Sequence, residues 1–204
     1  MRFLLLLSAF ASLVLARDPA TVTPQPSPSV REKWDHFTRE TFAPFTLAAG
    51  GFNATFSQLT QSAPLYGRNW KAYPDRFGAS VADNVSQNFF EDFVLASALR
   101  EDTRYVRLGS SHRMWMRVGY ALSRAVIVRR NEGGETFNLA NVGGSAISAA
   151  LSNLYYPPAS RTPSGALVNW STNIAGSGLA NLLPEFWPDF SAWLTRHQPF
   201  HRRH

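Results

Sequence analysis

The sequence contains no cysteine, which excludes disulfide bonds and thiol chemistry. Charged residues make up only 17% of its 204 residues, and among the 20 basic residues only Lys33 and Lys71 are lysine. The motifs G-x-S-x-G and H-E-x-x-H, a Walker loop and a dinucleotide fingerprint are all missing. We therefore expect no cofactor, no catalytic residue and no metal site. Stability has to come from packing, from a partner or from a membrane.

The N-terminus has the pattern of a secretory signal peptide. Arg2 precedes an apolar run, Phe3–Leu15. The small or modest-sized residues Val14, Leu15 and Ala16 occupy the cleavage-site positions. The run is shorter than the roughly 20 residues that cross a bilayer as a helix. We predict a signal peptide over 1–16, a Pro-rich flexible leader over 17–28, a helical domain over 29–195 and a basic His/Arg tail over 196–204. An uncleaved N-terminal anchor is the alternative; either way the protein is exported, to the periplasm, the cell envelope or the extracellular space.

The net charge of +6 comes almost entirely from arginine. Arginine favours fixed anionic partners, and a modest positive charge favours anionic surfaces. The expected partner is a membrane surface or an envelope protein, with an anionic lipid or a glycan as a further ligand. No nucleic-acid-binding signature is present, so nucleic acid is not an expected partner. The oligomeric state does not follow from the sequence.

Apolar periodicity predicts an all-α fold. Ser29 and Glu32 form a capping box that opens the first helix. No stretch keeps the alternation of a β-strand. We expect a compact bundle of five to seven helices, and the helices predicted after the first one are Phe42–Leu59 (broken at Gly50-Gly51), Phe77–Arg100, His112–Arg129, Asn138–Tyr156 and Gly165–Leu183.

The stretch Asn138–Tyr156 is the predicted centre of this bundle. Small residues recur in it every four positions, which on a helix makes one ridge: Ala140, Gly144, Ser148 and Ser152. Such a ridge lets a neighbouring backbone come close, as in small-xxx-small helix pairs. With Gly165–Leu183 it is expected to form a central small-residue hairpin.

Four blocks occur in order along the chain, namely RFGASVADN (Arg76–Asn84), REDTRYVRLG (Arg100–Gly109), SNLYYP (Ser152–Pro157) and EFWPD (Glu185–Asp189). In these blocks the chain resembles an uncharacterised family of exported bacterial proteins without assigned activity. Relatives carry a loop closer to H-Q-D-P-R-Y-F, of which the Asp, Arg and Tyr match here. The resemblance implies export and a single domain, and it implies no activity.

Two polar stripes are the main candidate binding residues. Asp83, Gln87 and Glu91 form an acid-amide stripe, while Arg113, Arg117 and Arg124 form a basic stripe on the next helix. Helices joined by a short connector tend to lie antiparallel, so the stripes are predicted to face one another across a groove. Solvated faces or a structural ion-pair network are the alternative.

The loop residues Asp102, Arg104 and Tyr105 form a second candidate site. The alternative for Asp102 is a structural one, in which it pairs with Arg104 or Arg107 or caps the following helix.

Taken together, these features favour a non-enzymatic exported envelope protein that is peripheral to, or packed against, a membrane or a membrane-bound partner. A lipid- or glycan-binding module using the groove between the two stripes is the first alternative. The second is a carboxylate-dependent hydrolase using Glu91 or Asp102 with a nearby arginine.

Overall fold

The computed structural model describes residues 27–197. The predicted signal peptide, most of the predicted leader and most of the predicted tail lie outside this range. The helices within it are α2 (Val30–Thr41), α3 (Pro44–Thr60), η1 (Trp70–Ala72), α4 (Tyr73–Asn88), the π-helix η2 (Phe89–Leu95), α5 (Ala96–Ala98), α6 (Met114–Ser123), α7 (Leu139–Leu151), η3 (Ser152–Leu154), η4 (Pro158–Ser160), α8 (Pro163–Ala180) and α9 (Leu182–Arg196). The prediction of a compact all-α bundle of five to seven helices is confirmed.

Helix α2 begins with the predicted capping box. The Ser29 side chain accepts a hydrogen bond from the backbone N–H of Glu32, and the Glu32 carboxylate accepts one from the backbone N–H of Ser29. The predicted break of the next helix at Gly50-Gly51 is wrong, because α3 continues through both glycines. Gly50 lies against α4, where a Cβ would come 3.5 Å from Ser80 Oγ, an ordinary contact distance, so this glycine lies at a helix contact rather than at a helix end.

Three short strands form a small antiparallel sheet in the order β1 (Glu101–Asp102), β2 (Ile127–Arg130) and β3 (Glu135–Phe137). The predicted extension of helix His112–Arg129 to its last residue is therefore wrong. The helix ends at Ser123, and β-branched Ile127 and Val128 then pair with β3. Gly133 and Gly134 have positive φ, which allows the tight turn between β2 and β3.

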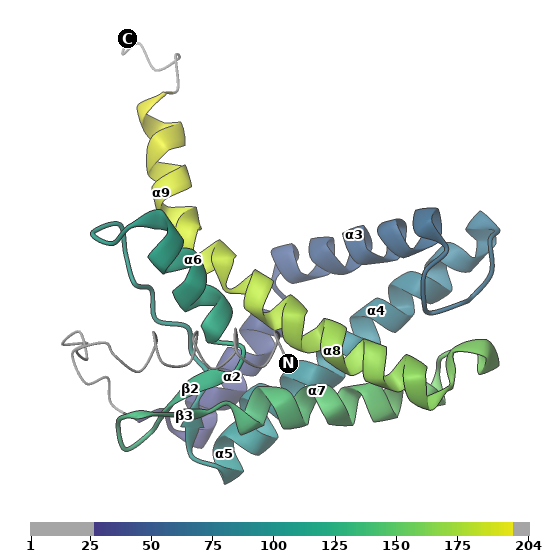
Figure 1. Cartoon of the computed structure of the whole chain (residues 1–204), viewed down its shortest axis with the longest axis horizontal. Coiled ribbons are helices and arrows are strands. Elements are labelled where there is room, and N and C mark those ends of the chain that lie inside the picture. The colour runs from purple at the N-terminus through teal and green to yellow at the C-terminus, as the bar shows by residue number, and fades with distance from the viewer. Residues whose placement is uncertain (1–26, 198–204) are drawn as a thin grey trace, which may run out of the picture.

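The C-terminal helix α9 runs continuously from Leu182 to Arg196, with Pro188 inside it. In Figure 1 this helix leaves the body of the bundle and points away from α3.

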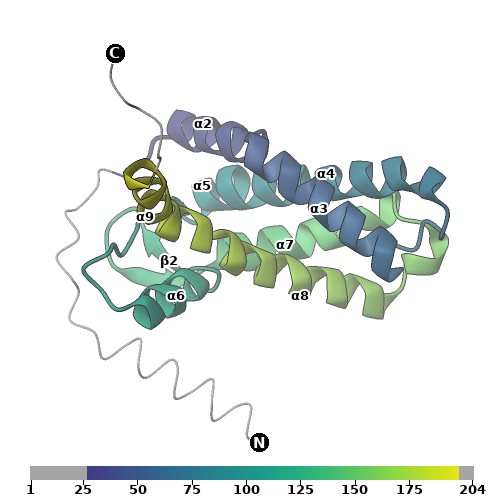
Figure 2. The same ribbon diagram turned by 90° about the horizontal axis from the view of Figure 1, so that it is seen from above.

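Helix α7 lies at the centre of the bundle. It packs against α4, η2 and α8, and Figures 1 and 2 show α7 and α8 side by side as the predicted hairpin. The four residues of its small-residue ridge are all buried. At Gly144 the backbone of η2 comes so close that a Cβ would lie 2.8 Å from the Glu91 backbone nitrogen. The absence of side-chain bulk on α7 thus sets the distance between the two central helices.

Small residues dominate the buried apolar positions. Alanine is the most frequent, and the larger buried apolar side chains among the described residues are Phe37, Val128 and Tyr156. Most phenylalanines and tryptophans remain partly or largely exposed, a distribution that leaves the larger apolar side chains on the outside of the bundle.

Candidate functional site

The predicted residues Tyr105 and Arg117 meet at a carboxylate that the sequence analysis did not single out. Glu185 on α9 is fully buried. Its side chain accepts hydrogen bonds from Arg117 Nε at 2.6 Å, from the Tyr105 hydroxyl at 2.8 Å, and from the backbone N–H groups of Leu108 and Gly109 at 2.8 and 3.1 Å. Burial alone raises the pKa of Glu185, but these bonds outweigh it and hold the pKa below its usual value.

Asp189, one helical turn further along α9, extends this cluster. Arg107 Nη2 donates to one carboxylate oxygen of Asp189 at 2.6 Å, and Arg117 Nη2 donates to the other at 2.5 Å. The Arg117 guanidinium also lies 4.3 Å from the centre of the Phe186 ring. Protein groups bind Nε and Nη2 of Arg117 and both carboxylate oxygens of Glu185, so this cluster anchors α9 to the loop and to α6.

The two predicted stripes make their contacts with other elements and do not form a shared groove. Gln87 bonds to Ser177 on α8, and Glu91 accepts a bond of 3.3 Å from Gln87 on its own helix. On the basic side, Arg124 pairs with Glu135 of β3 at 2.8 Å. The prediction that the stripes face one another is wrong, because the connector between them forms β1 and carries α6 onto α8 and α9.

The remaining members of the predicted sites have structural surroundings. Arg113 is exposed at the start of α6. Asp102 is buried in β1, and Arg104 Nε donates to its carboxylate at 2.8 Å, as in the structural alternative for this loop. Burial and the charge of Asp92 raise the pKa of Glu91 well above its usual value. Glu91 and Asp102 do not line the cavity described below.

Asp83, a predicted site residue, lies in the wall of a cavity. Its two carboxylate oxygens accept hydrogen bonds from the Tyr155 hydroxyl at 2.7 Å and from the Tyr156 hydroxyl at 2.6 Å. Burial raises the pKa of Asp83 to about 6, although the two tyrosine bonds lower it. These contacts join two sequence blocks more than 70 residues apart, RFGASVADN and SNLYYP, just as Glu185 joins the other two.

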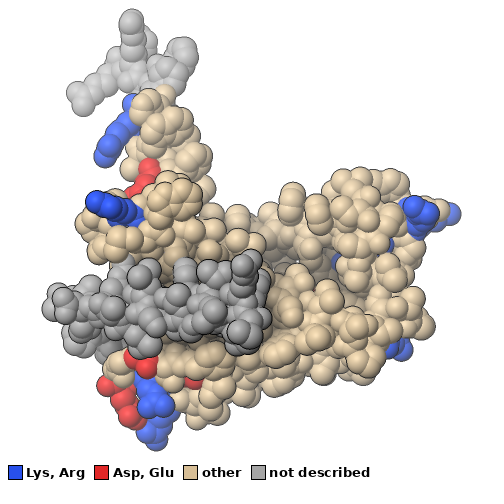
Figure 3. All heavy atoms as spheres, in the orientation of Figure 1, with Lys and Arg blue, Asp and Glu red and all other residues tan. Residues whose placement is uncertain are grey.

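The cavity has a volume of about 380 Å³ and lies between α3 and α4 on one side and α8 on the other. The surface is hollowed between α3 and α8 in Figure 3. Its walls are rich in amides and hydroxyls: Asn53, Ser57, Ser80, Asn84, Ser160, Thr162, Ser164, Asn169, Thr172 and Asn173 line it, with Asp83, Arg76 and Tyr156. The i, i+4 spacing of Asn169 and Asn173 is a sequence signal that predicts a shared helix face, but nothing in the sequence places α3 and α4 opposite that face.

A second surface feature is the lack of charge on α3 and α8. Neither helix contains Asp, Glu, Lys or Arg over Pro44–Thr60 or Pro163–Ala180. Figure 3 shows a broad uncharged area across these two helices, with basic side chains at the far tip of the molecule.

Comparison of the chain with protein-family models, curated proteins and solved structures finds no match among them. Among residues 27–197, none of the helices combines the length and the apolar character needed to span a bilayer. The same residues contain no group of three or more His, Asp or Glu side chains arranged to hold a metal ion.

Proposed function

We propose that this protein is a non-enzymatic exported protein that docks on a membrane surface through the outer side of α3 and the aromatic side chains of α9. Export is proposed from the predicted signal peptide, and thus from sequence alone. Membrane docking is proposed from the structure of α3.

The observation that carries the proposal is the inverted amphipathicity of α3. This helix buries Gly50, Ala54, Ser57 and Gln58, which are small or polar. It exposes its large apolar side chains on the opposite side, with exposed fractions of 73% for Phe52 and 55% for Phe56, and Phe45 and Leu59 lie on the same stripe. A helix with its apolar side turned outward gains free energy only when another apolar phase covers it.

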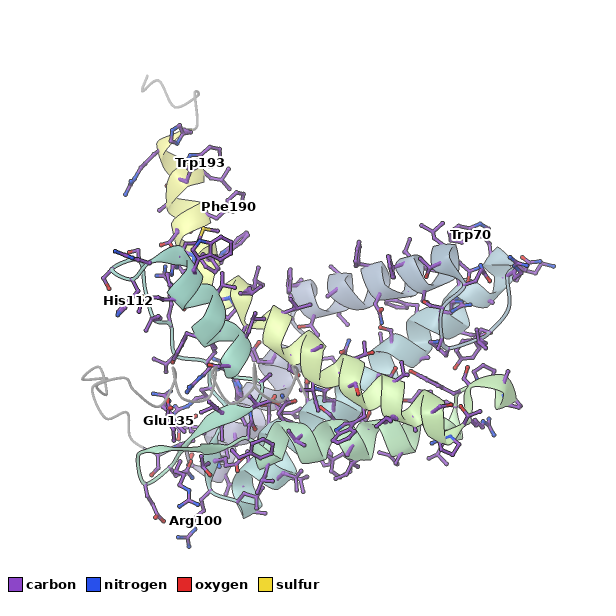
Figure 4. All side chains as sticks on the ribbon, viewed as in Figure 1. Trp70, Arg100, His112, Glu135, Phe190 and Trp193 are labelled. Atoms are coloured by element: carbon purple, nitrogen blue, oxygen red, sulfur yellow. The ribbon has the colours of Figure 1, made fainter. Side chains whose placement is uncertain are left out.

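Aromatic residues on other elements support membrane docking through the same side of the molecule. Trp187, Phe190 and Trp193 on α9 are each about half exposed. In Figure 4 Phe190 and Trp193 lie at one end of the upper side of the molecule and Trp70 at the other, with α3 between them. Tryptophan at the edge of an apolar surface is typical of proteins that sit at the level of lipid headgroups.

A vesicle flotation assay tests the proposal with the protein recovered after expression, its N-terminus determined by mass spectrometry. The vesicles contain phosphatidylethanolamine and phosphatidylglycerol at 3:1. The double variant Phe52→Ser/Phe56→Ser removes two exposed phenylalanines from α3. The matched control is Phe137→Ser, because Phe137 is 53% exposed but lies on β3.

We expect wild type and Phe137→Ser to float with the vesicles. At about 1.5 kcal/mol for each phenylalanine, the double variant should bind about 100-fold more weakly. Equal flotation of the double variant and wild type would contradict a role for α3. A wild type that fails to float and sediments as a dimer would show instead that a second copy covers this face.

A further inference from the structure

We infer that the cavity between α3, α4 and α8 is a binding site for a small neutral polyhydroxylated ligand, of the size of a mono- or disaccharide. This site is separate from the proposed membrane contact, because α3 turns its buried residues to the cavity and its phenylalanines outward. Failure of either proposal therefore leaves the other standing.

The size of the cavity fits a ligand rather than isolated water molecules. A volume of about 380 Å³ falls in the range of roughly 300–1,000 Å³ that is typical of small-molecule sites. A bundle whose interior is otherwise packed with alanine and serine keeps this space open because α8 buries little of its surface against α3 and α4.

Several side chains in the cavity wall have unused hydrogen-bonding groups. Asn84 and Thr172 make no side-chain hydrogen bond to the described residues. Asn173 Nδ2 is buried and has no partner there, while Asn53 reaches Ser80 only at 3.5 Å. An amide offers a donor and an acceptor side by side, which matches the hydroxyl groups of a sugar. Asp83 adds carboxylate oxygens that the two tyrosines hold in position.

The charges in the wall favour a neutral ligand over an ion. Arg76 is 2% exposed, and its Nη atoms donate to Ser57 Oγ and to the carbonyl oxygens of Ser62, Pro64 and Gly67. No carboxylate among residues 27–197 lies within ion-pair distance of Arg76, so its positive charge faces the cavity together with the negative charge of Asp83. One charge of each sign leaves no net attraction for a free anion or cation.

Saturation-transfer NMR tests the inference with glucose, galactose, mannose and N-acetylglucosamine, and with glucuronate and inorganic phosphate as charged comparisons. Thr172→Trp fills the cavity with an indole ring from an exposed position on α8. Its matched control is Ser171→Trp, the adjacent exposed residue, which does not line the cavity. Thermal melting by circular dichroism establishes that both variants fold.

We expect at least one neutral sugar to receive saturation from wild type and from Ser171→Trp, and to bind at least tenfold more weakly to Thr172→Trp. If Thr172→Trp does not fold, Asn84→Leu replaces it. Its control is Asn153→Leu, because the Asn153 side chain bonds only to the carbonyl oxygens of Ala149 and Ala150 and does not line the cavity. No transfer to any neutral sugar would overturn the inference. So would transfer that Thr172→Trp leaves unchanged, or tighter binding of glucuronate or phosphate than of the neutral sugars.

Discussion

Gly144→Ala should destabilise the protein, although alanine is the better helix former. In an exposed helix this change stabilises by about 1 kcal/mol. Here the new Cβ would lie 2.8 Å from the backbone nitrogen and 3.0 Å from the Cα of Glu91, well inside ordinary contact distance. Those atoms belong to the backbone of η2, so no side-chain rotation relieves the overlap and the two central helices must separate. We expect a net loss of about 1–3 kcal/mol in the free energy of unfolding.

Gly176→Ala is the matched control on α8. A Cβ at Gly176 meets nothing within 4 Å, so the same substitution should stabilise the protein by about 0.5–1 kcal/mol. Urea denaturation followed by circular dichroism at 222 nm measures both changes. The signs should be opposite. A Gly144→Ala variant as stable as wild type would refute the close approach of α7 and η2 and, with it, the role of the small-residue ridge.

Two further substitutions test the buried charges. Burial raises the pKa of Asp83 from 3.8 to about 6, so the folded state binds this proton more tightly than the unfolded state does. Asp83 should therefore lower the stability by about 2 kcal/mol as pH rises from 4 to 7, and Asp83→Asn should lack this part of the decline when urea midpoints are compared at the two pH values. Glu185→Gln should cost about 3 kcal/mol, because it removes the fully buried one of the two carboxylates that pair with buried Arg117. Its control, Glu132→Gln, breaks a largely exposed pair with Arg100 and should change stability by no more than about 0.5 kcal/mol, which chemical denaturation resolves.

Local patterns in the sequence predicted much of the secondary structure. The capping box at Ser29 and the small-residue run before Ser152 depend on residues only a few positions apart, and both appear in the structure. The errors fall where tertiary contacts outweigh local signals. Gly50-Gly51 reads as a helix break but is a packing contact with α4, and Ile127–Arg130 continues an apolar helical pattern but pairs with β3.

The candidate sites show the same difference between local sequence signals and tertiary contacts. Asp83, Tyr105 and Arg117 could be chosen from the sequence because they are polar residues on predicted helices and loops. Glu185, which binds two of them, and the asparagines that line the cavity beside the third have no comparable local signal. The wrong expectation of facing stripes came from assuming an antiparallel hairpin across residues 101–113. Those residues instead form the strand β1 and the loop that contacts α9.

Composition and spacings within about two helical turns are enough to define a cysteine-free, helix-rich chain with one helix of small residues. The partners that those residues contact depend on the packing of elements far apart in the sequence. Asp83 bonds to Tyr155 and Tyr156, which are 72 and 73 positions away in the sequence. Arg117 pairs with Glu185 at a separation of 68 positions. The tertiary structure also decided that the phenylalanines of α3 face outward, since apolar periodicity marks one side of a helix and only packing determines whether that side is buried.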